Sequence, residues 1–305
     1  MSGAVLITGV GGLVGYHLAL RCLGEGARIR GMGRHRNQNI EDLSQHPAFT
    51  FVQGDIADPE PVGQLLAEGA DIVYHLAGQP FVWFANRHRE EDFRVNAFGT
   101  LRLLEAVAKG GVPRLVFAST GEVYGDVRLP TEETPPQPTN FYGLGKLVAE
   151  MYVQQYRQHA GLEYSILRIS LVYGPRMYRN VLYDLLAGAL SPERRIRLVA
   201  SLDSAYDLVY VEDVVDVLLR TQENGWRDTV VNISSGVGTP VRDLISLVGQ
   251  ELSMPDIQIE VAENPSPVEK VLANGRALAL GWRPQWALAE GVRAVIASMR
   301  AADAH

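Results

Sequence analysis

The fold is decided near the start of the chain, by Ala4-Val-Leu-Ile-Thr-Gly9-Val-Gly-Gly-Leu-Val-Gly15. The first five residues are an apolar run typical of a buried parallel strand, and apolar residues at helical spacing follow from residue 13 to residue 23. Gly9 permits a tight turn, Gly12 lets the backbone approach a pyrophosphate at the helix N-terminus, and Gly15 lets the helix pack closely on the sheet. The stretch therefore predicts a dinucleotide-binding turn, with a glycine-rich turn that holds no ligand as the alternative.

Strands and helices alternate after this stretch, regularly in the first half of the chain and less regularly in the second. The alternation predicts an α/β fold, a Rossmann-like doubly wound parallel sheet with a ligand crevice at the carboxyl ends of its strands. We expect a dinucleotide-binding domain from residues 1–173 plus about 207–235, and a smaller C-terminal substrate-binding cap from about 174–206 plus 236–305. Strands are predicted at residues 28–33, 49–53, 71–76, 114–119, 164–169 and 229–233, and helices at 90–109, 141–159, 213–224 and 240–252.

Composition limits the classes of protein to consider. The 305 residues include 28 Lys and Arg against 35 Asp and Glu, a net charge of −7, which disfavours nucleic acid and anionic membrane surfaces as partners. No apolar stretch is long enough for a membrane span, and the N-terminal residues lack the basic segment of a targeting signal. The single cysteine, Cys22, suits a reducing compartment, so we expect a cytoplasmic protein.

The end of the second predicted strand bears on the choice of cofactor. Gly33 is followed by Arg34 and Arg36, and no carboxylate occurs before Glu41. A carboxylate at this position pairs with the ribose hydroxyls of NAD, whereas arginine accommodates the 2′-phosphate of NADP. The pattern favours NADP over NAD, unless both arginines are ordinary exposed loop residues.

Two further strand ends carry polar or small residues that a cofactor could use. Asp55 follows the third strand, where its carboxylate either accepts from an adenine amino group or starts the next helix. His75 lies on the fourth strand, just before Leu76, and a lone histidine there is more often a buried core residue than a catalyst. Ala77 and Gly78 are small enough to let a cofactor lie close to the backbone.

Tyr142-Gly-Leu-Gly-Lys146 is the candidate catalytic pair. At the start of a helix, residues four apart lie on one face, so both side chains approach a common point. A nearby ammonium and an oxidised nicotinamide both favour the phenolate, which makes the pair a plausible proton-transfer device. Thr120 ends the preceding strand and could hydrogen-bond the same substrate oxygen; an ordinary amphipathic helix start is the alternative.

Taken together, these motifs resemble the extended short-chain dehydrogenase/reductases of the sugar-nucleotide epimerase/dehydratase kind. The resemblance covers nearly the whole chain, and its motifs occur in family order: Thr8 to Gly15, Gly54-Asp55, His75-Leu-Ala-Gly-Gln79, Asn96 with Gly99-Thr100, Ala118 to Gly125, Tyr142 with Lys146, Leu167-Arg168, Val172 to Arg176, Val209 to Asp213, and Gly281 to Pro284.

The resemblance implies roles for particular residues. Tyr142, Lys146 and Thr120 would form the catalytic trio, with Glu122 as a candidate acid or base and Asn96 supporting the site. No metal is implied, and a homodimer through the two helices at 90–109 and 141–159 is expected. The implied cofactor residues are Gly9, Gly12, Leu13, Gly15, Arg34, Arg36, Asp55, Ile56, Leu76, Ala77, Gly78, Tyr142 and Lys146, and the implied substrate residues are Gln79, Arg168, Tyr173 and Arg176.

The implied reaction is hydride transfer at C4 of a nucleotide-activated sugar, through a 4-keto intermediate. Family members that hold a nucleoside diphosphate usually have Asn where this chain has Ser170-Leu171, and Arg where it has Tyr206. Nearby arginines either substitute for these groups or form a solvated face. The alternatives are an NADPH-dependent reductase of a keto-sugar or another carbonyl compound, and a catalytically silent nucleotide-binding protein. The arginines concerned are Arg176, Arg179, Arg194, Arg195 and Arg197.

Overall fold

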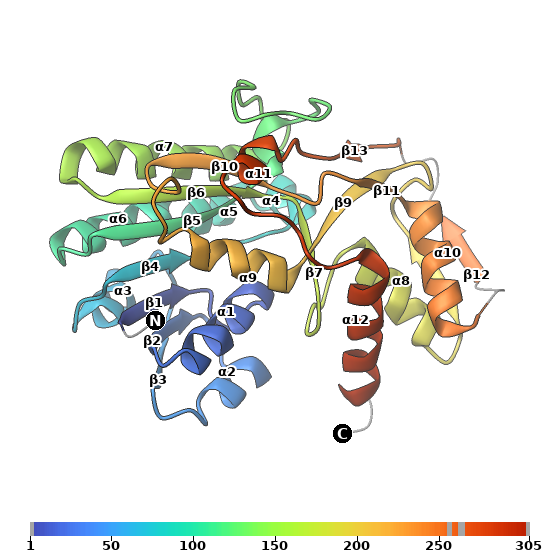
Figure 1. The fold of residues 1–305 in the computed structure, drawn as a ribbon, viewed down its shortest axis with the longest axis horizontal. Coiled ribbons are helices and arrows are strands. Elements are labelled where there is room, and N and C mark those ends of the chain that lie inside the picture. The colour runs from blue at the N-terminus through green and yellow to red at the C-terminus, as the bar shows by residue number, and fades with distance from the viewer. Residues whose placement is uncertain (1–2, 255–257, 262–265, 303–305) are drawn as a thin grey trace. The chain divides into compact units, whose positions relative to one another are not determined.

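The computed structural model describes residues 3–254, 258–261 and 266–302, and the chain divides into two compact units (Figure 1). The first unit comprises residues 1–125, 132–169 and 215–231. The second comprises residues 126–131, 170–214 and 232–305. The predicted cap segment 236–305 lies in the second unit, although its residues 255–257, 262–265 and 303–305 are outside the described part of the chain.

The first unit is built on a seven-stranded sheet. Each neighbouring pair from β3 to β6 is parallel, and β1 has β2 on one side and β4 on the other, which makes the carboxyl end of β1 the point where the strand order reverses. In spatial order the strands are β10 (Thr229–Ile233), β6 (Glu163–Ile169), β5 (Arg114–Thr120), β4 (Ile72–His75), β1 (Ala4–Thr8), β2 (Arg28–Gly33) and β3 (Phe49–Gln53). This is the predicted doubly wound parallel sheet.

Helices cover both faces of this sheet (Figure 1). On one face α3, α6 and α7 bury a continuous apolar cluster that includes Leu6, Leu103 and Val153. On the other face α1 brings Cys22 close to the buried ring of Tyr74. The helices are α1 (Leu13–Gly24), α2 (Gln38–Leu43), α3 (Pro59–Leu66), α4 (Val82–Arg87), α5 (Arg89–Phe93), the π-helical turn η1 (Arg94–Phe98), α6 (Gly99–Lys109), the 3-10 turn η2 (Gly121–Tyr124), α7 (Phe141–Ala160) and, shared with the second unit, α9 (Val211–Arg220).

Local signals at both ends explain the length of α7. The Asn140 side chain accepts a hydrogen bond from the backbone N–H of Gly143 at 2.8 Å and so caps the N-terminus. Gly161 ends the helix in the left-handed conformation, at φ 70°. The cap places Tyr142 on the first turn and Lys146 one turn later.

The predicted helix at 90–109 is interrupted. Residues 94–98 form a π-helical turn between α5 and α6, so the helical register shifts at Asn96. The buried Asn96 side chain is bonded to the main chain of Gln79, in the loop after β4. The spacing of apolar residues along the chain cannot predict this long-range contact. π-helical turns are often found at functional sites.

The second unit contains two small sheets. In the first, β9 (Ala205–Tyr210) pairs with β7 (Leu171–Tyr173), β11 (Gly238–Pro240) and β13 (Glu269–Lys270); in the second, β8 (Arg195–Leu198) pairs with β12 (Gln258–Val261). These pairings differ from the predicted boundaries, because residues 170–173 and 207–214 belong here and not with the large sheet. The helices of this unit are α8 (Val181–Leu190), α10 (Val241–Leu252), α11 (Gly275–Ala279) and α12 (Leu288–Ala302).

The motif around Asp213 has a structural task in the second unit. The Asp213 carboxylate accepts from the backbone N–H groups of Gln285 at 2.8 Å and Trp286 at 3.3 Å. The buried Trp282 indole donates to the Asp213 carbonyl at 3.2 Å. The segments 209–213 and 281–284, which the resemblance singled out, therefore fix each other.

Of the described helices, none is both long enough and apolar enough to cross a membrane.

Candidate active site

The glycine-rich turn lies at the carboxyl end of β1. Gly9 has φ +73°, and a Cβ added there would lie 2.7 Å from the backbone N of Ala77. A Cβ on Gly15 would overlap the carbonyl oxygen of Gly9, so this glycine permits close packing on the turn itself and not on the sheet. Gly12 is the N-cap residue of α1 and supplies no side-chain cap. The first amides of α1 are thus left for a ligand, as a pyrophosphate site requires.

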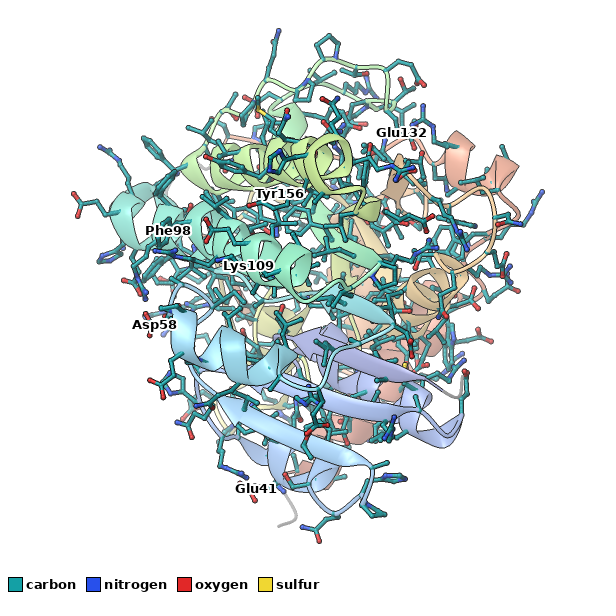
Figure 2. All side chains as sticks on the ribbon, turned by 90° about the vertical axis from the view of Figure 1, so that its left-hand side faces the viewer. Glu41, Asp58, Phe98, Lys109, Glu132 and Tyr156 are labelled. Carbon is teal, nitrogen blue, oxygen red and sulfur yellow. The ribbon has the colours of Figure 1, made fainter. Side chains whose placement is uncertain are left out.

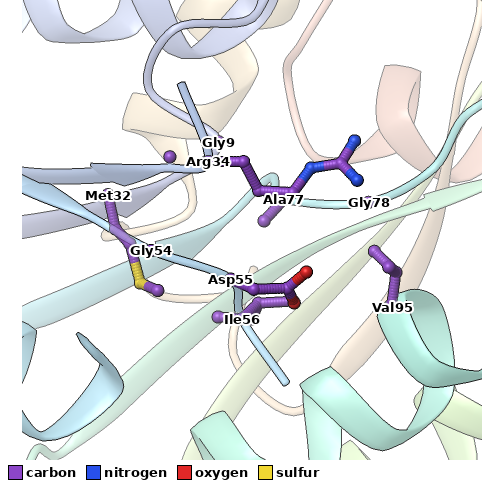
Figure 3. A pocket seen from close by; sticks show the side chains of 10 residues that line it. Gly9, Met32, Arg34, Gly54, Asp55, Ile56, Ala77, Gly78 and Val95 are labelled. Carbon is purple, nitrogen blue, oxygen red and sulfur yellow. The ribbon is translucent and has the colours of Figure 1, made fainter. Parts of the chain in front are cut away.

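A pocket of about 430 Å³, open solvent included, lies beside this turn (Figure 3). Its wall comes from the ends of β1, β2, β3 and β4, and four of its residues are glycines. A Cβ on Gly78 would lie 2.9 Å from the Asn96 side-chain oxygen, so the space depends on glycine. The bare backbone at these strand ends fits a dinucleotide, which lies close to the main chain in such folds. The lining residues are Gly9, Met32, Gly33, Arg34, Gly54, Asp55, Ile56, Ala77, Gly78 and Val95.

The two arginines after β2 differ in their surroundings. Arg34 lines the pocket (Figure 3). Arg36 is exposed, forms an ion pair with Glu41 at 3.5 Å and stacks 5.3 Å from the centre of the Phe51 ring. Only Arg34 is therefore among the residues that line the space.

The Asp55 carboxylate also faces the pocket, and both of its oxygens have partners. One accepts from Arg94 at 2.5 Å, and the other accepts from the backbone N–H of Ala57 at 2.9 Å. The second hydrogen bond closes a local turn that leads the chain into α3. This agrees with the interpretation of Asp55 as a residue that starts the next helix. The first holds the carboxylate at the rim of the pocket.

His75 is a buried, neutral core residue. Thr100 donates to the Asn96 carbonyl at 2.7 Å, so its oxygen accepts from His75 Nε2 at 2.9 Å. Nδ1 then accepts from the Thr8 hydroxyl at 2.7 Å. Burial, followed by the Lys146 charge, lowers the His75 pKa to about 3. The His75 ring links β4 to β1 and to α6 through these hydrogen bonds. At neutral pH it is an uncharged imidazole with one N–H.

Thr120, Tyr142 and Lys146 come together between β5 and α7. Thr120 ends β5, and its side chain is hydrogen-bonded to that of Tyr142. Lys146 is 5% exposed, and its Nζ lies 4.0 Å from the centre of the Phe117 ring. The trio expected from the sequence therefore forms one cluster.

The electrostatic surroundings of Tyr142 and Lys146 set their protonation. Burial raises the Tyr142 pKa, the Thr120 hydrogen bond opposes this, and the Glu122 and Asp92 charges raise the pKa further. Burial lowers the Lys146 pKa to about 7, against the Glu150 and Asp92 carboxylates, which raise it. Tyr142 is thus a phenol at neutral pH in the ligand-free chain, and Lys146 titrates near neutrality.

Glu122 follows Thr120 in the 3-10 turn. Its backbone N–H donates to the Thr120 hydroxyl oxygen at 3.2 Å, and its carboxylate accepts from the Asn140 side chain at 2.7 Å. Asn140 also caps α7. Glu122 is therefore partly buried beside Tyr142 and held in place by the helix start.

Two residues expected to bind substrate have other partners. The Gln79 amide nitrogen donates to Phe81 O at 2.9 Å and to Asp92 at 3.1 Å, and its oxygen accepts from Phe81 N at 2.6 Å. Arg168 is 5% exposed and binds the Glu150 carboxylate and the Tyr124 hydroxyl, the latter at 2.8 Å. Both side chains have hydrogen-bond partners within the protein, and their assignment as substrate ligands stays a prediction.

The sequence reasoning missed Glu150 and Asp92, the two buried carboxylates around Lys146. Glu150 binds Arg168 and accepts from the Ser119 hydroxyl. Helical spacing offered a signal, because Glu150 stands four residues after Lys146 and Asp92 four residues before Asn96.

The other two predicted substrate residues belong to the second unit. Tyr173 is buried, and its ring meets that of Tyr210 edge-on at 5.3 Å. Arg176 adopts φ +67°, a conformation that costs a non-glycine residue energy and often marks a functional position. Within the described residues, no group of three or more His, Cys, Asp or Glu side chains could hold a metal ion.

The large sheet is doubly wound and has a glycine turn at its switch point. A Thr/Tyr/Lys cluster lies at the end of β5 and the start of α7. Together these features define an enzyme of the NAD(P)-dependent short-chain dehydrogenase/reductase class. The family model "NAD dependent epimerase/dehydratase family" matches residues 5–234, and the chain belongs to this family.

Its relatives include nucleotide-sugar enzymes. UDP-glucose 4-epimerase of Mycolicibacterium smegmatis is 31% identical over 97% of this chain and 98% of its own length. The structure of UDP-glucose 4-epimerase with UDP-glucose from Thermotoga maritima has a TM-score of 0.91 and 29% identity, and covers 98% of this chain and 99% of the other. UDP-glucose 4-epimerase of Thermus thermophilus in complex with NAD has a TM-score of 0.86 and 27% identity over 98% of this chain and 99% of the other.

Proposed function

We propose that the protein is an epimerase/dehydratase-type oxidoreductase that acts on a nucleotide-activated sugar by hydride transfer at C4, through a 4-keto intermediate. The observation that carries the proposal is the hydrogen-bonded Thr120 and Tyr142 with Lys146 one helical turn away. The glycine-lined pocket beside them and the relatives that act on UDP-glucose or bind it support the assignment.

Each member of the trio has a distinct task. Tyr142 Oη accepts the proton of the C4 hydroxyl as the C4 hydrogen leaves with its electron pair, and returns a proton when the ketone is reduced again. Thr120 donates a hydrogen bond to the phenolate. The Lys146 ammonium adds positive charge beside the reacting oxygen. When bound in the pocket, an oxidised nicotinamide supplies the hydride acceptor and a positive charge that favours the phenolate.

The role of Glu122 depends on which reaction of the family the enzyme catalyses. A carboxyl group beside the sugar could serve as general base at C5 or as general acid at C6 in a dehydratase. Glu122 stands next to Thr120, and its carboxylate is held by Asn140. We therefore assign it a proton-transfer role if water is eliminated, and an electrostatic role if the enzyme is an epimerase.

We infer a preference for NADP over NAD from the end of β2. Arg34 lines the pocket there, and no carboxylate follows before Glu41, which pairs with Arg36. Replacing Arg34 by Ala should weaken NADP binding by about 10–100-fold and leave NAD binding nearly unchanged, because a charge-assisted contact to the 2′-phosphate is lost. Dissociation constants for both cofactors measure this. Arg36→Ala is the control, with a smaller effect; an equal loss for NAD and NADP in Arg34→Ala would refute the selectivity.

A keto-sugar reductase is the second candidate, favoured by the same Arg34, because reductases draw on NADPH from solution. The cofactor of the purified enzyme separates the two functions. Retained cofactor that turns over with no net oxidation or reduction supports the epimerase/dehydratase reaction. Stoichiometric consumption of added NADPH, with no retained cofactor, would overturn it in favour of the reductase.

The nucleoside diphosphate part of the proposal depends on groups in the second unit. Ser170-Leu171 and Tyr206 stand where family members usually have an amide and a guanidinium. We assign the diphosphate to Arg176, whose strained backbone suits a ligand-binding position. The cytoplasmic location that the single cysteine suggests stays a prediction.

We further propose a homodimer formed through α6 and α7. These helices lie side by side in Figure 2, which labels Phe98 at the end of η1, Lys109 at the end of α6 and Tyr156 on α7. The outer face of α7 exposes Leu144 at 46%, Met151 at 62% and Tyr152 at 38%, spacings that form one apolar stripe.

Placing a charge in this stripe should separate the subunits. Met151→Lys is expected to elute as a monomer in size-exclusion chromatography with light scattering, because a lysine would be desolvated in a paired interface. Val237→Lys, at a 63% exposed position in the second unit, should keep the native mass. A dimer of unchanged stability in Met151→Lys would exclude this interface.

A further inference from the structure

One buried carboxylate near the active site takes no direct part in the proton and hydride transfers described above. Asp92, on α5, is 1% exposed. One of its oxygens accepts from the Gln79 side-chain amide at 3.1 Å and from the Asn96 side-chain amide at 2.8 Å. Burial raises the pKa of this carboxyl, and the Gln79 and Asn96 hydrogen bonds and the Lys146 charge oppose that rise. The ionised form of Asp92 therefore depends on these three partners.

This carboxylate joins three segments of the active site. Gln79 belongs to the loop after β4 and Asn96 to the π-helical turn, and they also exchange two hydrogen bonds, from Gln79 N to Asn96 Oδ1 at 2.9 Å and from Asn96 Nδ2 to Gln79 O at 3.0 Å. The second Asp92 oxygen lies against α7, where a Cβ on Gly145 would be 3.0 Å from it. Gly145 directly precedes Lys146.

The Lys146 ammonium lies on the other side of the same loop. A Cβ on Gly78 would be 2.9 Å from Asn96 Oδ1 and 3.9 Å from Lys146 Nζ, so Gly78 is flanked by both. The titratable groups around Lys146 are Tyr142 and Glu150 on α7, Asp92 on α5 and the neutral His75 on β4. Glu150 is already paired with Arg168.

We propose that Asp92 is a positioning residue of the active site, which clamps Gln79 and Asn96 together and supplies, in addition to Glu150, a negative charge that stabilises the buried Lys146 ammonium. The hydrogen-bond partners of Asp92 within the described residues are amides, and no arginine is among them. Its charge raises the pKa of Lys146 and that of Tyr142. The catalytic consequence rests on the proposed function; the electrostatic part does not.

A lysine titration tests the proposal without substrate. The chain has three lysines, Lys109, Lys146 and Lys270, so protein labelled with carbon-13 lysine gives three side-chain signals, and Lys146→Arg identifies the one of interest. The Lys146 pKa, about 7 in the native chain, should fall by about one unit in Asp92→Asn, because removal of a nearby negative charge disfavours the ammonium. Glu91→Gln removes an exposed charge from the same helix and should leave the titration near the native value.

An unchanged Lys146 titration in folded Asp92→Asn would overturn the proposal. Asp92→Ser, also neutral, takes its place if the asparagine variant does not fold, and must shift the pKa in the same direction. Loss of the clamp alone would lower turnover without moving this pKa, so the measurement separates charge from structure. Failure of the native enzyme to convert nucleotide sugars would reject the proposed function and leave the titration result intact.

Discussion

Replacing Tyr142 by phenylalanine should lower turnover by about 10³-fold while cofactor affinity changes by only a few-fold. The variant loses one hydroxyl, which is the group placed to accept and return the substrate proton, and general acid–base groups contribute on this scale. The phenylalanine ring fits the space of the tyrosine ring. The side-chain contact that the variant loses is the hydrogen bond between the phenolic oxygen and Thr120. Steady-state kinetics with a nucleotide sugar, together with cofactor titration, measures both quantities.

The matched control is Tyr152→Phe. It makes the same substitution on the same helix, at a side chain that is 38% exposed. We expect near-native turnover from this variant. Native turnover in Tyr142→Phe, or an equal loss in both variants, would reject the catalytic role of Tyr142.

Replacing Gly9 by alanine should reduce the free energy of unfolding by about 2–4 kcal/mol, the combined cost of a left-handed alanine and an overpacked turn. Its φ is +73°, and the added Cβ would lie 2.7 Å from Ala77 N and 2.8 Å from the Leu76 carbonyl carbon. These are backbone atoms of the β4 end, which cannot rotate away. The same displacement should close the pocket, so we also expect cofactor binding to be lost.

The control has the opposite expected sign. Gly63 lies within α3, and a Cβ there would meet nothing within 4 Å. Gly63→Ala should therefore stabilise the protein by about 0.5–1 kcal/mol, because alanine is the better helix former. Urea denaturation monitored by circular dichroism measures both variants. A Gly9→Ala protein as stable as the native one would show that the turn does not depend on glycine.

The layout of the large sheet was predictable because local signals determine it. The strands at 4–8, 28–33, 49–53 and 229–233 have the predicted bounds, and the helix predicted at 141–159 ends one residue later. Short apolar runs that stop at glycine, and helices with an asparagine or glycine at their ends, need no long-range information. The second unit was less predictable, because β9 pairs with β7, β11 and β13 and not with the strands of the large sheet.

The site was predictable in its residue types and less so in its side-chain directions. Thr120, Tyr142 and Lys146 meet because strand end and helix start bring them together. Nothing in the sequence indicates that Gln79 and Arg168 turn inward to Asp92 and Glu150. The π-helical turn at Asn96 depends on the same inward network, which is why a simple helical period did not predict it.

The most direct test of the central claim is the absorbance at 340 nm of the cofactor-loaded enzyme mixed with a nucleotide sugar, with no other redox reagent present. Hydride transfer at C4 predicts a transient rise in the native enzyme, because substrate oxidation reduces the bound nicotinamide, and no rise in Tyr142→Phe. Each of UDP-, dTDP- and GDP-linked glucose should be tried in turn, because each carries a C4 hydroxyl that can be oxidised. A native enzyme that binds the cofactor and shows no rise with any of these sugars, or a Tyr142→Phe variant that shows the native signal, would contradict the account.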